Sequence, residues 1–273
     1  MSVVYLLGHP VAHSLSPAMQ NAAFAAVGLP HRYEALDIGP NDLGALVARI
    51  ASGEVLGANV TIPYKETVMP LAQAWDGTAL AVQAANTLAR HEHEGRSWVQ
   101  AWNTDGGGFQ VALQQAGIDV AARATLVLGA GGAARAVLYM LLSGGAHVRL
   151  ANRSRARADL VVASVAGVNG ERASAVSWDA RLDLSGVDLV VNATSLGLHG
   201  DDPLMNVALE PPLTIVDLVP TAAPTPLIRR ARAAGLAHLD GLPMLLHQGA
   251  MSFKLWTGKD APLDAMRRAL RSN

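Results

Sequence analysis

Residues 125–134 read Thr-Leu-Val-Leu-Gly-Ala-Gly-Gly-Ala-Ala, a short apolar run that passes directly into a glycine-rich turn. This fits the pattern G-x-G-x-x-G/A, which follows a strand and opens a helix in dinucleotide-binding folds. In that pattern Gly129 permits the tight turn, Gly131 lets the backbone approach a pyrophosphate, and Ala134 allows close helix–strand packing. Unpaired N–H groups at the helix start would then attract the phosphates. A glycine-rich turn without a ligand is the alternative when the motif stands alone.

The loop after the next predicted strand bears on which dinucleotide would bind. NAD-specific folds place an Asp or Glu about 20 residues beyond the glycines, where it bonds the ribose 2′-hydroxyl. Here residues 152–157 read Asn-Arg-Ser-Arg-Ala-Arg, with three arginines and no carboxylate. Guanidinium groups pair with phosphate in a bidentate way, so this loop suits the 2′-phosphate of NADP. A solvated basic loop is the simpler alternative, and the upstream glycine motif favours NADP.

Strand and helix patterns alternate on both sides of this motif. The short apolar runs that predict strands lie at residues 3–8, 32–38, 55–61, 125–128, 147–151, 187–192 and 214–219. The helical patterns between them lie at residues 17–27, 42–50, 64–74 and 133–142. Such alternation predicts an α/β protein built from parallel βαβ units. Residues 86–90 and 98–102 predict a hairpin that turns at Glu94-Gly95, which would make the first sheet mixed.

A change of composition at Thr104-Asp105-Gly106-Gly107-Gly108 indicates the passage from one domain to the next. We expect a first domain at residues 1–103 and a Rossmann-type domain at residues 104–239. The helices predicted within residues 240–273 could pack on either domain, and local patterns alone do not decide which.

The composition narrows the class of protein. The 273 residues include no cysteine, which excludes disulfides, thiolate zinc sites and a cysteine nucleophile. A net charge of −1 argues against a nucleic-acid partner. No uncharged apolar run is long enough to span a membrane, and residues 1–10 lack the basic flank of a signal peptide. We therefore expect a soluble, cytoplasmic protein, and the composition does not name its function.

Four polar segments of the first half stand out, and two of them have an ordinary structural explanation. Ser16 before Pro17 is a common helix N-cap, and Asp105 could cap the helix that follows it. Lys65 closes the segment Asn59–Lys65 at a predicted helix start, where the helix dipole disfavours a purely structural lysine. The polar groups of Asn59–Lys65 also lie at the end of a predicted strand, where open α/β sheets hold ligands. The remaining segment is Asn86-Thr87.

Taken together, these segments resemble the shikimate dehydrogenase family over nearly the whole chain. The matching segments, in the order and spacing of that family, are residues 13–17, 57–65, 86–87, 103–105, 129–133, 152–154, 192–195 and 240–248. The resemblance implies an N-terminal substrate domain with a mostly parallel sheet, a Rossmann-type NADP domain, and C-terminal helices, residues 240–273, that return to the first domain. It implies reversible oxidation of shikimate to 3-dehydroshikimate with NADP, in the chorismate and aromatic amino acid pathway.

The resemblance also implies roles for particular residues. The implied catalytic pair is Lys65 and Asp105. The residues implied to contact the substrate are Ser14, Ser16, Thr61, Asn86 and Gln248. The residues implied to hold NADP are Gly129, Ala130, Gly131, Gly132, Ala133, Asn152, Arg153, Ser154, Arg157, Leu218 and Gly241.

The implied chemistry suits these residue types. Oxidation of a secondary alcohol moves a hydride to nicotinamide and releases the hydroxyl proton, which a positioned side chain can accept. Our hypothesis is that Lys65 accepts this proton during oxidation and donates it during reduction, while Asp105 orients both groups. A binding module would have no use for such a pair.

Some residues depart from the family pattern. Pro220 stands where many members carry a tyrosine, Pro243 where glycine is usual, and Ala85 and Trp102 are also atypical. These departures put the exact substrate in question and keep two alternatives open. One is a paralogue that oxidises quinate or aminoshikimate, and the other is a non-catalytic member that binds NADP or a metabolite. A monomer and a homodimer are both compatible with the sequence.

The two imidazoles of His91-Glu92-His93 invite a metal-site interpretation. Two ligands beside a predicted turn do not make a closed site, so a solvated hairpin tip is favoured and no metal is expected.

Overall fold

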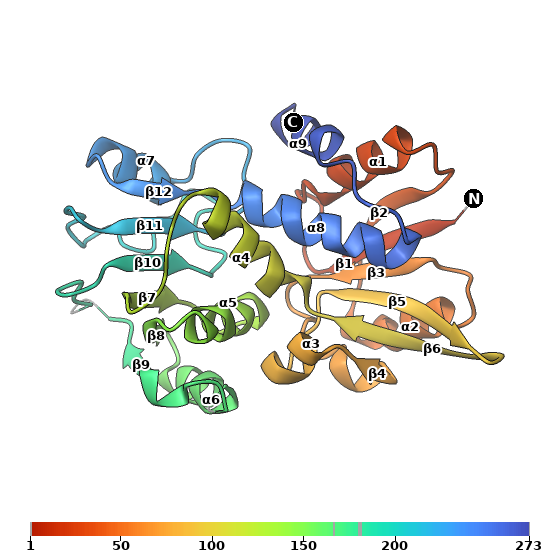
Figure 1. Ribbon diagram of the computed structural model, residues 1–273, viewed down its shortest axis with the longest axis horizontal. Helices are drawn as coiled ribbons and strands as arrows, with labels where there is room; N and C mark the ends of the chain where they lie inside the picture. The colour runs from red at the N-terminus through yellow and green to blue at the C-terminus, as the bar shows by residue number, and fades with distance from the viewer. Residues whose placement is uncertain (1, 166, 180–181, 273) are drawn as a thin grey trace. The chain divides into compact units, whose positions relative to one another are not determined.

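The computed structural model describes residues 2–165, 167–179 and 182–272. The chain divides into two compact units, one of residues 1–108 and 245–273 and the other of residues 109–244. Both divisions lie a few residues beyond the expected ones, within helix α4 (Thr104–Gln115) and helix α8 (Leu242–Thr257). The C-terminal helices thus belong to the same unit as the N-terminal sheet. Each unit is a sheet with helices on both faces (Figure 1).

The second unit contains the glycine motif and has the strand order of a dinucleotide-binding fold. Its elements are β7 (Ala124–Leu128), α5 (Gly132–Ser143), β8 (His147–Asn152), α6 (Arg155–Ser164), η3 (Gly170–Arg172), β9 (Ala173–Ser177), β10 (Leu189–Asn192), β11 (Thr214–Asp217), α7 (Pro226–Ala233) and β12 (Ala237–Leu239). The sheet order is β12-β11-β10-β7-β8-β9, with all pairs parallel. The chain reverses its winding between β7 and β10, which is where doubly wound sheets bind ligands.

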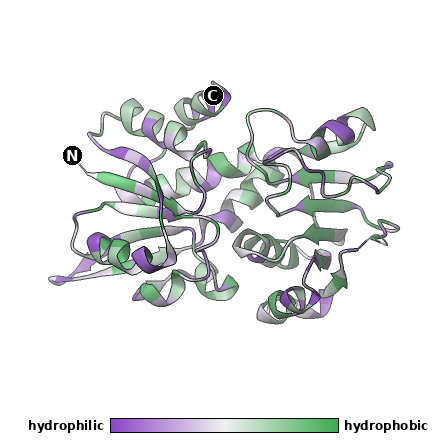
Figure 2. Cartoon of the chain, turned by 180° about the vertical axis from the view of Figure 1, so that it is seen from behind, coloured by the Kyte–Doolittle hydropathy of each residue, from purple (hydrophilic) through white to green (hydrophobic). Residues whose placement is uncertain are grey.

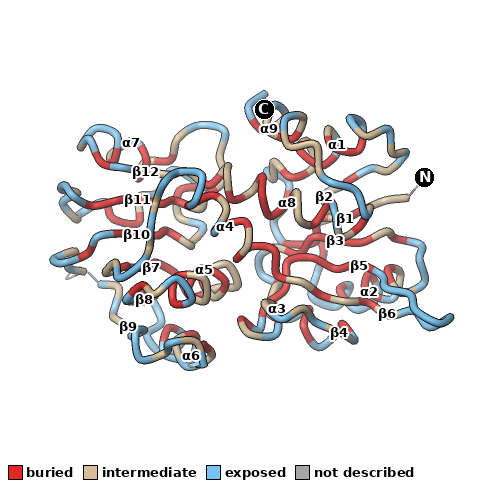
Figure 3. Tube along the Cα trace, in the orientation of Figure 1, coloured by how far each residue is buried: buried red, intermediate tan, exposed pale blue. Residues whose placement is uncertain are grey.

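Burial on both faces explains the continuous apolar character of these strands. Every residue of β10 and β11 is buried (Figure 3), and Figure 2 shows the strands of this sheet in mainly hydrophobic colours. Alternate side chains of β7 enter different cores, Val127 on one face and Leu126 with Leu128 on the other. A parallel sheet covered on both sides reads as an apolar run, which is why its strands were predictable.

The first unit has a mixed sheet. Its elements are β1 (Val3–Gly8), α1 (Ser16–Ala26), β2 (Arg32–Asp37), η1 (Pro40–Asp42), α2 (Leu43–Ala51), β3 (Gly57–Val60), η2 (Met69–Leu71), β4 (Ala74–Trp75), α3 (Gly77–Val82), β5 (Thr87–His93), β6 (Arg96–Trp102) and α9 (Leu263–Arg271). The order is β2-β1-β3-β5-β6-β4, with β5 antiparallel to both of its neighbours. The predicted hairpin is confirmed, and Glu94 and Gly95 have the positive φ values that such a turn needs.

The direction of β5 decides where the polar segments meet. Asn59 near the end of β3 pairs with Thr87 at the start of β5, and Thr87 pairs with Trp102 at the end of β6. The residues that follow β3, precede β5 and follow β6 therefore share one edge of the sheet.

The helix predicted at residues 64–74 is wrong. The chain forms turns there, followed by the short 3₁₀ helix η2. Pro70 lacks an N–H group and would clash with the carbonyl one turn earlier, so a continuous α-helix cannot pass through it. Lys65 consequently lies in a loop, and the helix-dipole argument for it fails.

Glycines allow helix α8 to pack closely on the sheet and on α4. A Cβ atom on Gly57 would clash with the Trp256 ring and lie 2.7 Å from the Leu88 carbonyl oxygen. A Cβ atom on Gly108 would lie 2.7 Å from the backbone of Gln248. The Trp256 indole also donates to the Leu88 carbonyl at 3.0 Å, which aligns the helix.

We predict that Gly57→Ala lowers the free energy of unfolding by about 1–3 kcal/mol, because the added methyl overpacks Trp256 and backbone. The matched control is Gly77→Ala at the start of α3, where nothing lies within 4 Å of the new methyl. Urea denaturation of both variants tests this, and equal stabilities would contradict it.

Candidate functional site

Lys65 and Asp105 form a buried ion pair at the sheet edge described above. Lys65 Nζ donates to Asp105 Oδ2 at 2.6 Å, and the two side chains are 14% and 6% exposed. Lys65 lies in the loop after β3, and its carbonyl accepts from Ala85 N at 2.8 Å. Asp105 lies in the first turn of α4. A buried carboxylate is tolerated only with partners, so this pair constrains the loop after β3 and the start of α4.

Asn86 holds the other oxygen of Asp105. Its side-chain nitrogen donates to Asp105 Oδ1 at 2.9 Å and lies 3.1 Å from Gln248 Oε1. Its side-chain oxygen accepts from Thr104 N at 2.8 Å. The Asn86 amide, just before β5, thereby connects this part of the chain with α4 and α8, and it joins Gln248 and the ion pair in a single cluster.

The helix-capping explanations of two residues are wrong. Asn103 Oδ1, rather than Asp105, accepts from a backbone N–H of the first turn of α4, that of Gly106, at 3.3 Å. Helix α1 has Leu15 at its N-cap, and Ser14 Oγ accepts from Ser16 N at 3.2 Å. The side chains of Asp105 and Ser16 are therefore not used for capping.

Ser14 and Thr61 lie in the loops that follow the neighbouring strands β1 and β3. Thr61 N donates to Leu7 O at 2.8 Å, and Gly8 has no side chain because a Cβ atom there would lie 2.5 Å from Thr61 Cγ2. Within the described part of the chain, no hydrogen bond joins either hydroxyl to the Lys65–Asp105 pair.

A buried polar network behind the ion pair escaped the sequence analysis. Tyr33 Oη donates to Asn59 Oδ1 at 2.8 Å, and Asn59 Nδ2 donates to the Asn86 carbonyl at 2.9 Å. Burial raises the pKa of the Tyr33 phenol, a shift that a hydrogen bond with Ser16 opposes, so the phenol stays protonated. Ser252, one helical turn beyond Gln248, joins the same network. Its position four residues after Gln248, on the same face of a predicted helix, was the sequence signal that could have indicated this.

The glycine motif of the second unit leaves room for a ligand. Gly129 has φ +108°, and a Cβ atom there would also lie 3.1 Å from the Ala193 carbonyl oxygen. Gly131 is the N-cap of α5 in an extended conformation, and no atom lies within 4 Å of a Cβ built on it. Neither φ nor protein packing requires glycine at 131, so the open space there suits a bound group that approaches the backbone.

The arginine loop lies beside this motif. Ser154 caps α6 by accepting from Arg157 N at 3.3 Å, and Asn152 Nδ2 donates to the Ser154 carbonyl at 3.0 Å. Arg157 Nε donates to the Ala130 carbonyl at 2.9 Å, which ties the two loops together. Arg155 pairs with Asp159 at 3.1 Å, whereas Arg153 is exposed and has no acceptor within the described residues.

Leu218 and Gly241 meet through their backbones at the end of β11. A Cβ atom on Gly241 would lie 2.6 Å from the Leu218 carbonyl oxygen, so only glycine fits. Asp217 anchors this loop, since it accepts from Asn192 Nδ2 at 2.8 Å and Thr225 Oγ1 at 2.5 Å. Burial raises the pKa of the Asp217 carboxyl, although these hydrogen bonds oppose the shift.

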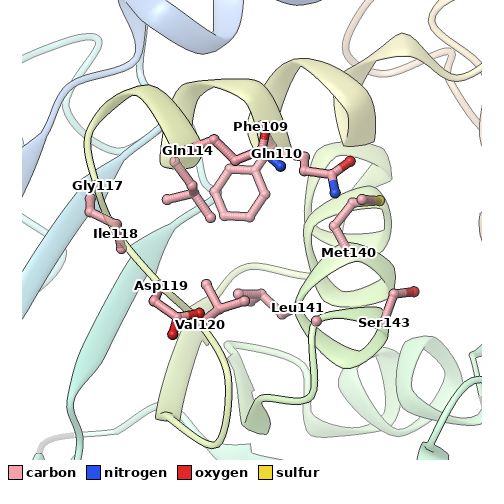
Figure 4. Close-up of a pocket in the computed structure, with 12 residues that line it drawn as sticks. Phe109, Gln110, Gln114, Gly117, Ile118, Asp119, Val120, Met140, Leu141 and Ser143 are labelled. Carbon is pink, nitrogen blue, oxygen red and sulfur yellow. The ribbon is translucent and has the colours of Figure 1, made fainter.

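A separate cavity of about 510 Å³ lies between the C-terminal halves of α4 and α5 (Figure 4). Its lining includes Phe109, Leu113, Ile118 and Met140 and none of the predicted site residues. The loop of residues 117–120 borders it and precedes β7, so the cavity lies at the edge opposite the glycine motif.

Two further findings concern metals and membranes. Over residues 2–165, 167–179 and 182–272, no group of three or more His, Cys, Asp or Glu side chains could hold a metal ion. No helix in that same part of the chain is long and apolar enough to cross a membrane.

Comparison with known proteins gives matches over the full length. Two family models match, the shikimate dehydrogenase substrate binding domain at residues 6–88 and the shikimate 5′-dehydrogenase C-terminal domain at residues 241–271. Shikimate dehydrogenase (NADP(+)) of Symbiobacterium thermophilum is 45% identical over 98% of this chain and 92% of its own length. The protein of the same description from Moorella thermoacetica is 42% identical, with the same coverage.

Solved structures agree with these matches. Shikimate 5-dehydrogenase of Thermus thermophilus, in complex with NADP(H) and shikimate, has TM-score 0.85 and 37% identity over 100% of this chain and 99% of that chain. Quinate dehydrogenase of Corynebacterium glutamicum, in complex with NAD, has TM-score 0.88 and 28% identity, with the same coverage.

We predict that Asp217 makes stability depend on pH. A carboxyl whose pKa is higher in the folded state than its ordinary value of 3.8 binds more protons when folded, so the unfolding free energy falls as pH rises from that value through the folded pKa. Asp217→Asn removes this component, and its stability relative to the wild type should rise across that window and then level off.

Urea denaturation from about pH 4 to pH 8 measures the difference. Asp183→Asn is the control, because hydrogen bonds from Ser185 lower the pKa of that exposed carboxyl and no such gain should appear. Parallel pH profiles for the wild type and Asp217→Asn would refute the assignment.

Proposed function

The chain belongs to the shikimate dehydrogenase family, and from this premise we propose that it catalyses the NADP-dependent, reversible oxidation of shikimate to 3-dehydroshikimate. It is accordingly an alcohol oxidoreductase of aromatic amino acid biosynthesis. The observation that carries the proposal is the buried Lys65–Asp105 pair, held by Asn86 at a polar sheet edge. A protein that only bound its ligands would not need a proton-transfer pair kept out of water.

Proton transfer is the role we assign to this pair. Oxidation converts shikimate and NADP⁺ to 3-dehydroshikimate, NADPH and a proton, and NADP⁺ when bound supplies the hydride acceptor. In reduction the Lys65 ammonium of the ion pair gives a proton to the carbonyl oxygen. In oxidation the deprotonated form of Lys65 accepts the hydroxyl proton at Nζ as the carbon–hydrogen bond breaks. Asp105, 2.6 Å away, orients Nζ and stabilises the ammonium that forms.

Substrate recognition is assigned to polar side chains around the pair. Asn86 and Gln248 would bond ring hydroxyls, and their mutual hydrogen bond would rearrange as they do so. Ser14, Ser16 and Thr61 would bind the carboxylate and a hydroxyl, with the first turn of α1 providing positive backbone dipole to the anion. A site built to pair hydroxyls discriminates strongly against analogues that lack them.

NADP is assigned to the glycine motif and the arginine loop. The open space at Gly131 fits a pyrophosphate at the N-terminus of α5. The exposed Arg153 would pair with the 2′-phosphate, and Arg157 fastens its loop to Ala130. The complete proposed set is Gly129, Ala130, Gly131, Gly132, Ala133, Asn152, Arg153, Ser154, Arg157, Leu218 and Gly241.

The four residues that depart from the family pattern lie outside the Lys65–Asp105–Asn86 cluster. The Trp102 ring packs 5.4 Å from the His91 ring on the hairpin and against the core beneath α1, so it has a structural role. Ala85 is buried, and Pro220 and Pro243 are half-buried. None of these four removes a member of the Lys65–Asp105–Asn86 cluster.

The proposal also includes a cytoplasmic location and a monomeric or homodimeric state.

We expect NADP⁺ reduction, followed by nicotinamide absorbance, with shikimate as substrate. Four assays pair shikimate or quinate with NADP⁺ or NAD⁺, and kcat/KM should be highest for shikimate with NADP⁺. NADP⁺ binding without turnover on either substrate would contradict the proposed function. A higher kcat/KM for quinate would reassign the substrate.

We further expect Lys65→Ala to lower kcat by about 10²–10⁴-fold, because the proton acceptor is lost. Shikimate binding, measured by calorimetry, should persist. The control is Lys254→Ala, which removes an exposed lysine paired with Asp260 and should leave turnover unchanged. Near-normal turnover of folded Lys65→Ala would exclude the assigned role.

A further inference from the structure

Ser252 is a fully buried hydroxyl where four polar groups converge. Its oxygen lies 3.0 Å from Asn59 Nδ2, 2.7 Å from Thr87 Oγ1 and 3.2 Å from Thr104 Oγ1. It also donates to the carbonyl of Gln248, one turn earlier in α8, at 3.0 Å. The sheet, α4 and α8 are therefore joined through this single side chain.

The hydrogen-bonding capacity of a hydroxyl makes this junction directional. A serine donates one hydrogen and accepts two. With its own hydrogen on the Gln248 carbonyl, Ser252 accepts from Asn59 and from one threonine hydroxyl. It thus specifies the direction of the one threonine hydroxyl that donates to it, and the other threonine hydroxyl is left to donate to Asn86 Oδ1.

The neighbours of Ser252 are the groups that hold Asn86. Asn59 Nδ2 donates to the Asn86 carbonyl at 2.9 Å as well as to Ser252. The hydroxyl of Thr104 lies 3.2 Å from Asn86 Oδ1 and 2.9 Å from Asn86 Nδ2. Asn86 in turn donates to Asp105, the partner of Lys65. A continuous set of buried hydrogen bonds therefore connects Ser252 with the ion pair.

We propose that Ser252 is a positioning residue for the dehydrogenase reaction, an inference that rests on the proposed function. Its hydroxyl keeps the Asn86 amide in the orientation that holds Asp105 and meets Gln248. Without it, both threonine hydroxyls turn to Asn86 Oδ1, which lies 3.3 Å from Thr87 Oγ1 and 3.2 Å from Thr104 Oγ1 and already accepts from Thr104 N. The hydrogen bonds around Asn86 must then be shared differently in a space closed to solvent. The rearrangement reaches Asn86, so both substrate binding and proton transfer are affected.

The test compares three variants in the shikimate–NADP⁺ assay. Ser252→Ala should lower kcat/KM for shikimate about tenfold, the effect of one lost buried hydrogen bond, while the KM for NADP⁺ stays unchanged. Ser252→Cys retains a weak donor and acceptor of similar size and should recover part of the loss. Thr257→Ala is the matched control, because Thr257 makes the same bond to the carbonyl four residues earlier in α8, Phe253 at 2.8 Å, and lies outside the network.

The outcomes separate this proposal from the proposed function. An active wild type with Ser252→Ala equal to Thr257→Ala would overturn the positioning role alone. A wild type that neither turns over nor binds shikimate in calorimetry would overturn the proposed function, and the positioning role with it. If Ser252→Ala fails to fold, Ser252→Cys decides the question. A kcat/KM for shikimate equal to that of Thr257→Ala would then also overturn the role.

Discussion

A carboxylate removed from water sets the main constraint on this protein. Asp105 is buried, and an uncompensated charge in that position would cost several kcal/mol. Both of its oxygens are engaged, one by Lys65 and the other by Asn86. These partners come from the loop after β3 and from the residue just before β5, so they meet only because β5 runs antiparallel beside β3. The contacts of Asp105 therefore depend directly on the strand order and strand direction of the first sheet.

Helix α8 completes the site because glycines let it approach. Gly57 admits the Trp256 ring, and Gly108 admits the backbone of Gln248. Once the helix is seated, Gln248 reaches Asn86 and Ser252 enters the polar network beneath the sheet edge. Gly57 and Gly108 therefore contribute to the site by setting how closely α8 packs on the sheet and on α4.

In the second unit the main feature is a helix N-terminus, that of α5, whose backbone is left uncovered by other side chains. Its parallel sheet buries apolar strands on both faces, so the polar side chains lie in the loops that follow the strands. Asp217 bridges Asn192 and Thr225 there and holds two loops in place. Gly131 keeps the start of α5 uncovered, and Arg157 ties the basic loop to it.

Features of the fold that depend on neighbouring residues alone could be predicted from the amino-acid sequence. The Rossmann-type unit followed from apolar runs and the turn at Gly129, and the hairpin from Glu94-Gly95, because periodicity and positive-φ residues are local signals. The failed helix at residues 64–74 shows the limit, since Pro70 overrode a helical pattern. Local patterns left the place of the C-terminal helices open, and the family resemblance, rather than any local signal, implied their return to the first domain. The three-dimensional packing was needed to show that Asp105 and Ser16 are not caps, and that Tyr33, Asn59 and Ser252 meet behind Asn86. Those outcomes depend on strand direction and helix packing between segments far apart in the chain, which no local pattern records.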